Sequence, residues 1–294
     1  MRPMVYLLNK GTQGGEIQRL NGQHPMLMAV TGRLMPDAVR KYLGALGRPP
    51  AVADIATGTG IWLQSIAKEL PSDAQLDGYD ISTQAFPETP WEPANMRLME
   101  ADACEPFADE VLGSYDVVHV RLMSYALGKE QWEEVARNLL SLLRPGGYIF
   151  WEECGYAAMT CIPLTETFQK VYSLDARYAV TMGRDITMPC RLFGHLQNAG
   201  YVDVAPSIYD SFSLGDAFQK SAQWFIISVL KQSLHGIVAR GGCEWLRSDD
   251  DVERAVEQMY RDRDEHGCLY GFQMHWFVGR APRPELSGRD GQAR

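Results

Sequence analysis

Short apolar runs alternate with amphipathic stretches between residues 51 and 153 of this chain. The runs have the length of buried strands, and the stretches repeat apolar residues at the spacing of a helix face. Strands separated by helices form a parallel sheet with helical crossovers, so this pattern predicts an α/β fold. The expected strands are 51–56, 75–80, 96–100, 115–120 and 147–153, and the expected helices between them are 60–69 and 129–143.

Helical periodicity also precedes and follows this core. It covers residues 16–48 and ends at Pro49-Pro50, so we assign 1–48 to a helical N-terminal arm or lid and 49–155 to the core. Region 156–280 should hold helical cap insertions at 163–182, 189–199, 216–238 and 249–265, with strands at 201–206 and 269–279. These strands complete a mostly parallel, seven-stranded sheet with helices on both faces. The tail 281–294 should be disordered.

Composition restricts the partners of the chain. Twenty-eight basic and 37 acidic residues give a net charge of −9, and no run of Lys or Arg forms a basic stripe. We therefore expect no nucleic-acid or membrane partner. No segment reaches the roughly 18 apolar residues of a membrane span, and the first residues are too short a run for a signal peptide, which predicts a cytoplasmic protein. Six cysteines without a C-x-x-C pair indicate reduced thiols, and we expect no metal site.

The apolar strand at 51–56 runs directly into a glycine turn and a helix. Glycines let a backbone pass close to a ligand, and the helix that follows presents free N–H groups. Such turns also occur as ordinary strand-to-helix connections. A dinucleotide site would need G-x-G-x-x-G, whereas Leu63 stands at the third glycine and bulky Trp62 disfavours close phosphate packing.

Acidic and polar residues end the strands that follow. Asp80 lies about 20 residues past the glycine turn, where a carboxylate accepts hydrogen bonds from ribose hydroxyls, the alternative being a surface aspartate that caps a turn. Asp102 follows the third strand, and the fourth ends near His119 and Arg121. An R-P-G-G turn at 144–147 leads into the fifth strand.

This series resembles the class I S-adenosylmethionine-dependent methyltransferases over about 100 residues. Residues 54–62, 76–82 and 86–87 resemble more narrowly the methyltransferases of fungal secondary metabolism. The resemblance implies a Rossmann-like sheet and S-adenosyl-L-methionine as cofactor. It also implies that residues 19–24 belong to an arm that closes over the cofactor. Ala56 departs from the family pattern, because the first glycine of the loop is usual there.

The resemblance places cofactor-binding roles on individual residues. The loop under the methionine and adenosine comprises Asp54, Ala56, Gly58 and Gly60. Asp80 is the implied ribose ligand, and Ile81 lies against the adenine face. Asp102 and Ala103 lie beside the adenine amino group, and His119 and Arg121 face the methionine end.

Methyl transfer needs an acceptor held in line with the C–S bond, and a hydroxyl or amine acceptor also benefits from a base. His119 is our first catalytic candidate, the alternative being a histidine that holds the loop or the cofactor's carboxylate. His24 is a second candidate, the alternative being an exposed turn residue. Glu152 and Glu153 follow one another at a strand end, so alternation sends one into the site, and Glu152 is our candidate. Arg121 should pair with a carboxylate, of the methionine moiety or of Glu152.

The implied function is O-methylation of a small-molecule secondary metabolite, with N- or S-methylation as alternatives. A different class is a methyltransferase-like protein that binds the cofactor without transferring methyl, either a regulator or a pericyclase. A protein methyltransferase is a third interpretation. The oligomeric state is not predicted. A set of residues that are expected either to line an apolar acceptor pocket or to pack in the core comprises Met26, Met28, Tyr172, Tyr178, Trp224, Phe225 and Met259.

Overall fold

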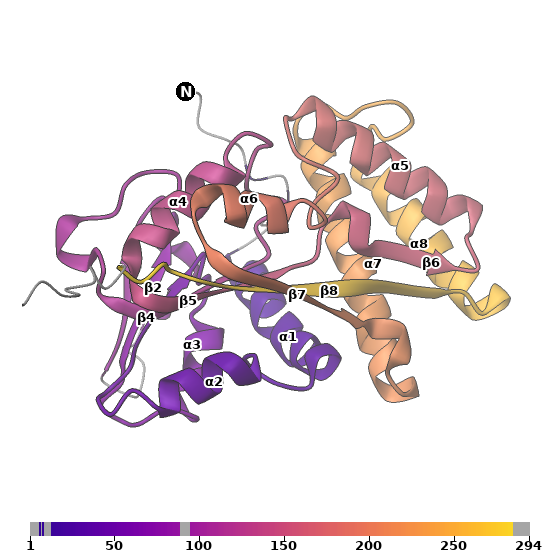
Figure 1. Ribbon diagram of the computed structural model, residues 1–294. Helices are drawn as coiled ribbons and strands as arrows, with labels where there is room; N and C mark the ends of the chain where they lie inside the picture. The colour runs from indigo at the N-terminus through magenta and orange to yellow at the C-terminus, as the bar shows by residue number, and fades with distance from the viewer. Residues whose placement is uncertain (1–5, 7, 9–12, 89–94, 285–294) are drawn as a thin grey trace, which may run out of the picture.

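Figure 1 shows the computed structural model, which describes Tyr6, Leu8 and residues 13–88 and 95–284. Its centre is a twisted sheet of eight strands. In chain order the strands are β1 (Ala51–Ile55), β2 (Gln75–Asp80), β3 (Met96–Glu100), β4 (Tyr115–Arg121), β5 (Leu143–Glu153), β6 (Met159–Ile162), β7 (Val202–Asp210) and β8 (Leu269–Arg280).

The strand order is β3-β2-β1-β4-β5-β8-β6, and β7 pairs with β8 as well. Strands β1 to β5 pair in parallel, whereas β8 is antiparallel to β5, β6 and β7. The mostly parallel α/β sheet is therefore confirmed. The eighth strand, β6, was not predicted, because four residues are too few to show an alternating pattern.

Helices cover both faces of the sheet (Figure 1). They are α1 (Gln13–Thr31), α2 (Asp37–Gly44), α3 (Ile61–Ala67), α4 (Trp132–Leu142), α5 (Glu166–Thr181), α6 (Leu192–Ala199), α7 (Asp216–Ala239) and α8 (Asp249–His266). In the view of Figure 1, α4 and α6 lie above the sheet and α1, α2 and α3 below it. Helices α5, α7 and α8 pack on one another beside β6 and β8.

Local signals in the sequence set several helix ends. Helix α8 begins with a capping box in which Ser248 and Asp251 each bond the other's backbone N–H. Thr165 caps α5 by accepting from Phe168 N. Gly200 and Gly267 end α6 and α8 with positive φ, which glycine adopts without strain.

The sheet topology brings the site together. Strands β1, β2, β4 and β5 are parallel neighbours in register, so the loops at their carboxyl ends meet along one edge. Open α/β sheets bind ligands at this edge. Helix α1 packs on α3 and α7 and so lies beside these loops.

The predicted regions 1–48 and 281–294 are described only in part. Residues 1–5, 7, 9–12 and 285–294 lie outside the described residues, so the disordered tail and the lid role of the arm stay predictions. Within the described part, no helix is both long enough and apolar enough to span a bilayer. The residues described also hold no cluster of three or more His, Cys, Asp or Glu suited to a metal ion.

Candidate active site

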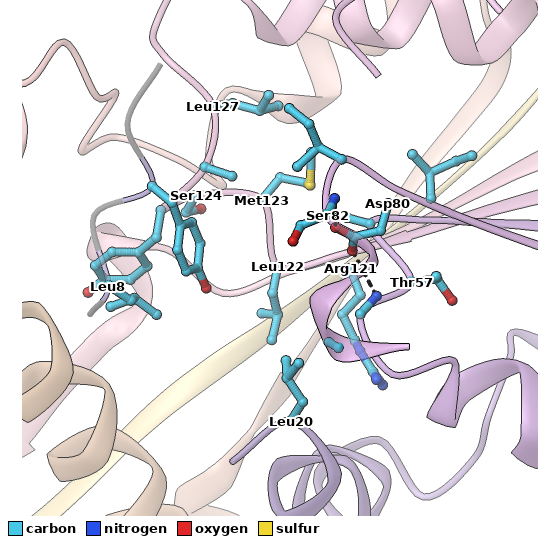
Figure 2. Close-up of a pocket in the computed structure, with 18 of the residues that line it drawn as sticks. Leu8, Leu20, Thr57, Asp80, Ser82, Arg121, Leu122, Met123, Ser124 and Leu127 are labelled. Atoms are coloured by element: carbon cyan, nitrogen blue, oxygen red, sulfur yellow. Dashed lines mark hydrogen bonds between the residues drawn. The ribbon is translucent and has the colours of Figure 1, made fainter. Parts of the chain in front are cut away.

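The loops after β1, β2, β4 and β5 enclose a cavity of about 350 Å³ together with α1 and α7. This volume is in the range of small-molecule pockets. Figure 2 shows Thr57, Asp80 and Ser82 at one end, which we call the loop end, and Leu8 and Ser124 at the other. The second end, which we call the cap end, adjoins α7 and is lined by Ser124, Tyr125, Glu153, Cys154, Met159, Phe225 and Val229.

The turn after β1 alternates through left-handed residues. Ala56, Gly58 and Gly60 have φ angles of 56°, 58° and 75°. A left-handed conformation costs an L residue roughly 1–2 kcal/mol and costs glycine nothing comparable. Ala56 therefore adopts a conformation better suited to the glycine that is usual at this position in the family. Ala56 and Gly58 line the cavity, whereas Gly60 packs on Met96 and Leu98 and starts α3.

Asp80 closes the loop end. Its Oδ2 accepts a hydrogen bond from Gly58 N at 2.9 Å and its Oδ1 one from Ser82 N at 3.0 Å, which fixes the carboxylate at the cavity edge (Figure 2). Ile81 beside it is 65% exposed, and Asp102 lines the same end. A fixed carboxylate next to a glycine turn suits ribose hydroxyls, and an exposed apolar side chain suits the face of a base.

Three residues form a hydrogen-bonded row behind the cavity wall, and we call Asp54, His119 and Glu152 the buried network. His119 Nδ1 donates to Asp54 Oδ1 at 2.6 Å, and His119 Nε2 donates to Glu152 Oε1 at 2.9 Å. Asp54 also accepts from Thr57 Oγ1 at 2.6 Å and Glu152 from Trp276 Nε1 at 2.7 Å. Because a carboxylate only accepts hydrogen bonds, both ring nitrogens of His119 carry protons.

The electrostatics of His119 agree with this assignment. Burial alone would lower the pKa of His119, but Asp54 and then Glu152 outweigh it, and the pKa rises above its ordinary value. The ring also stacks on Trp62 with centroids 3.7 Å apart. The imidazolium therefore offsets part of the charge of two buried carboxylates, and Asp54 links it to the glycine loop through Thr57.

His24 and Arg121 form a second contact beside the cavity. Arg121 Nη1 donates to His24 Nδ1 at 3.2 Å, so the ring proton is on Nε2, which donates to Ser65 Oγ at 2.9 Å. Burial and then Arg121 lower the pKa of His24 to about 3. His24 is therefore neutral with both nitrogens engaged. Arg121 lines the cavity and lies 3.9 Å from Glu152.

At the cap end, two hydroxyl groups each stand in front of a buried carboxyl. Ser124 Oγ donates to Glu153 Oε1 at 2.9 Å, and Tyr125 OH donates to Asp175 Oδ2 at 3.3 Å. Burial raises the pKa of Glu153 to about 7 and that of Asp175 to about 6. Among the described residues, no cationic side chain is one of the largest causes of either shift. These carboxyls differ in that respect from those of the buried network.

Helix α1 covers the loop end. Arg19, Leu20 and Gln23 line the cavity, and Arg19 is held by Glu16 through contacts of 2.7 and 2.9 Å. Asn21 Oδ1 accepts from Thr59 Oγ1 at 2.6 Å, which ties the helix to the glycine loop. A ligand at the loop end therefore touches α1.

The structure separates the sequence-predicted residues into two groups. Those that line the cavity are Ala56, Gly58, Asp80, Ile81, Asp102, Ala103 and Arg121. Asp54, Gly60 and His119 lie behind them and hold the loop. None of the three catalytic candidates, His119, His24 and Glu152, is among the lining residues, so we do not carry a catalytic role for them forward.

Alternation along β5 does send one glutamate toward the cavity, and it is Glu153. Sequence reasoning also missed Ser124, Tyr125 and Cys154. Their position just past β4 and β5 is the signal that would have found them, because ligands bind where parallel strands end. Of the residues expected either to line an apolar acceptor pocket or to pack in the core, Phe225 lines this cavity. Met26 and Met259 are buried in the core. The cavity's lining residues do not include Met28, Tyr172, Tyr178 or Trp224.

Comparisons with known proteins agree with this geometry. Residues 28–221 match the family described as "Methyltransferase domain". The chain is 26% identical to Methyltransferase grgD from a Penicillium species, over 90% of this chain and 95% of that one. It is 30% identical to N-methyltransferase tcpN from Claviceps purpurea, over 71% of this chain and 74% of that one.

A solved structure has the same fold. Phosphoethanolamine N-methyltransferase 2 from Haemonchus contortus, in complex with S-adenosylhomocysteine, aligns with a TM-score of 0.52 and 16% identity, over 94% of this chain and 58% of that one. The fold and the cavity thus define a class I S-adenosylmethionine-dependent methyltransferase. The chain belongs to the Methyltransferase domain family, and the predicted resemblance to fungal methyltransferases is confirmed.

The residues at the loop end fit S-adenosylmethionine as the cofactor. Gly58 has no Cβ at the point where the backbone borders the cavity, and a Cβ there would approach Leu20 to 3.2 Å. Asp80 presents a fixed carboxylate beside it, and Ile81 an apolar face. The set therefore offers partners for a ribose and a base at one end of the cavity.

Proposed function

We propose that the protein transfers the methyl group of S-adenosylmethionine to a hydroxyl oxygen of a small, largely apolar secondary metabolite. The observation that carries this proposal is the continuity of the cavity, which joins the loop end to an apolar cap end lined by Met159, Phe225 and Val229. Similarity to fungal methyltransferases supports a metabolite as the acceptor.

Bound S-adenosylmethionine supplies a methyl group on a positively charged sulfur, which makes that carbon electrophilic. The residues of the chain then have two tasks, to orient the acceptor and to exclude water. Positioning of this kind contributes up to about 7–11 kcal/mol to lowering a barrier. Helix α1 covers the loop end with Leu20, and α7 closes the cap end with Phe225 and Val229.

N-methylation is the second candidate, because the 30% identical relative from Claviceps purpurea is named an N-methyltransferase. A cofactor-binding protein that does not transfer methyl is a further outcome of the test. It has some support from Secondary metabolism regulator laeA of Fusarium oxysporum, which is 25% identical over 84% of this chain and 80% of that one.

The test is release of S-adenosylhomocysteine, measured by mass spectrometry with paired acceptors. Each pair consists of a neutral phenol and the aniline of the same skeleton. The proposal predicts turnover with phenols that exceeds turnover with the matched anilines, and loss of both in Asp80→Ala. Preferential turnover of anilines would assign the protein to N-methylation. Cofactor binding without turnover of any acceptor would contradict both.

A further inference from the structure

We infer that Ser124 and Glu153 together take up the proton that the acceptor loses on methylation, and that the acceptor carries a neutral hydroxyl at the reacting atom. The inference rests on the proposed function and assigns it a substrate class. It concerns residues at the cap end, away from the glycine loop that binds the cofactor.

Geometry gives the two residues different tasks. Both residues line the cavity, but Ser124 is 3% exposed and Glu153 is 0% exposed, so we infer that an acceptor reaches the carboxyl through Ser124. Ser124 Oγ donates to Glu153 Oε1 at 2.9 Å, so the lone pairs of Oγ are available to a donor in the cavity. An acceptor hydroxyl that donates to Ser124 Oγ is then one proton step from the carboxylate. Ser124 is the catalytic residue, and Glu153 acts through it.

The carboxylate is held in one orientation. Its Oε1 also accepts from Cys154 N at 3.1 Å, and its Oε2 accepts from Met123 N at 2.7 Å. Gly155 leaves room for the contact, because a Cβ there would lie 2.8 Å from Ser124 Oγ. The hydrogen bond from Met123 N to Glu153 also holds the loop that follows Leu122, a residue with a φ of 60°. Proton uptake by Glu153 therefore requires no rearrangement of its neighbours beyond a turn of the Ser124 hydroxyl.

Charge selects the acceptor class. Burial raises the pKa of Glu153 to about 7, and the largest influences on it from the described residues are hydrogen bonds from neutral donors and include no cation. The titratable groups next to Ser124 and Glu153 in the chain are Tyr125 and Cys154, and His275 lies opposite Glu153 on β8, while Arg19 and Arg121 line the same cavity. Burial raises the pKa values of Cys154 and Tyr125 and lowers that of His275, so none of them changes charge near neutral pH. At Ser124 an anionic acceptor would meet a carboxylate whose hydrogen-bond partners are neutral, whereas a neutral hydroxyl gains a hydrogen bond.

The step balances in charge and atoms. The acceptor oxygen forms the new C–O bond with a lone pair, and the electron pair of the broken C–S bond returns to sulfur. The hydroxyl proton passes to Ser124 Oγ as the proton of Ser124 passes to Glu153 Oε1. A positive sulfur and a negative carboxylate thus become a neutral thioether and a neutral acid. The carboxyl later returns its proton to solvent.

The first experiment follows S-adenosylhomocysteine release with the phenol panel as pH is varied. In the wild type, kcat/KM rises with pH through about 7, because the carboxylate form is the active one. Glu153→Gln and Ser124→Ala should each lower kcat about 100-fold and abolish this rise, with cofactor affinity unchanged. Ser124→Thr keeps the hydroxyl and should restore most of the rate. Benzoates of the same skeleton should not react.

Asp175→Asn is the matched comparison, because Asp175 is a buried carboxyl behind Tyr125 at the same end of the cavity. Loss of the pH dependence in Asp175→Asn with its retention in Glu153→Gln would assign the proton to the other pair and overturn the inference.

The second experiment needs no acceptor. Infrared difference spectra of the ligand-free protein should show a carboxyl that titrates near pH 7 in the wild type and is absent in Glu153→Gln. If no such carboxyl titrates, the inference fails even where methyl transfer is observed. If the carboxyl titrates but no acceptor is methylated, the proposed function fails instead.

Discussion

Glu152 and Glu153 are neighbours in the chain and belong to regions with opposite electrostatics. Glu152 lies in the buried network, where it accepts hydrogen bonds from His119 and Trp276 and has Arg121 at 3.9 Å. Glu153 lies at the cap end, where its partners are neutral and its pKa is raised by burial to about 7. Glu152 therefore has cationic side chains beside it, whereas the hydrogen-bond partners of Glu153 are neutral.

The difference indicates which region is structural and which is functional. A buried carboxylate that is paired with a cation stabilises the fold by completing that pair, and Glu152 is not among the residues that line the cavity. A buried carboxyl without such a partner costs stability, and proteins retain such groups mainly at functional sites. The predictions below test this contrast.

Replacing His119 by leucine should have the largest effect. The change leaves Asp54 and Glu152 buried without their shared cation, and breaking a buried pair of this kind costs about 3–5 kcal/mol. Urea unfolding measures the loss, with exposed His266→Gln as a control that should change stability by less than about 0.5 kcal/mol. A loss below about 1 kcal/mol for His119→Leu would show that the network does not hold the fold.

Glu153→Gln should change how stability depends on pH. The folded protein keeps the Glu153 proton up to about pH 7, whereas the unfolded chain releases it near its ordinary pKa of 4.5. The folded state therefore binds more protons in this window, and wild-type stability falls as pH rises through it. The variant lacks this contribution, so its stability relative to wild type should improve by up to about 3 kcal/mol between pH 4.5 and 7.5. Parallel stability curves would contradict the raised pKa.

Trp276→Phe should cost about 1.5–3 kcal/mol more than Trp132→Phe. Both tryptophans are 1% exposed, but Trp276 Nε1 donates to Glu152 Oε2 at 2.7 Å, while Trp132 Nε1 has no hydrogen-bond partner among the described residues. The two substitutions remove similar volume, so their difference in unfolding free energy reports the hydrogen bond to the network. Equal losses would mean that Glu152 does not depend on this donor.

Ala56→Gly should give the smallest effect, a gain of about 0.5–1 kcal/mol in unfolding free energy. Glycine relieves the strain at a φ of 56°, and this relief exceeds the entropy that glycine adds to the unfolded chain. Ala53→Gly, in the fully buried strand β1, is the control and should destabilise. Melting temperatures measure both, and a loss in Ala56→Gly would show that the loop does not strain this residue.

Much of the fold could be predicted because its signals are local. The strand-to-helix alternation between residues 51 and 153, the glycine turn and Asp80 at the end of β2 together define the parallel core. The short strand β6 could not, because its pairing with Leu269 and its neighbours is a long-range contact. The arrangement of α5, α7 and α8 likewise depends on tertiary packing that periodicity does not encode.

The site was predictable at the loop end and not at the cap end. Asp80 stands at a fixed spacing from the loop, and spacing is visible in the sequence. The role of His119 could not be predicted, because its two carboxylate partners, on β1 and β5, come together only in the folded sheet. Alternation along β5 left two choices, and the structure assigns Glu153 to the cavity because Glu152 is directed at His119 and Trp276.

The central claim is that S-adenosylmethionine binds at the loop end, because the roles given to the buried network and to the cap end both depend on it. Calorimetric titration with S-adenosylmethionine tests this claim most directly. The account predicts that the wild type binds one equivalent and that Asp80→Ala, checked for an unchanged circular dichroism spectrum, binds at least about 30-fold more weakly through loss of a charged hydrogen-bond acceptor. Equal affinity in the two proteins, or binding by neither, would contradict it.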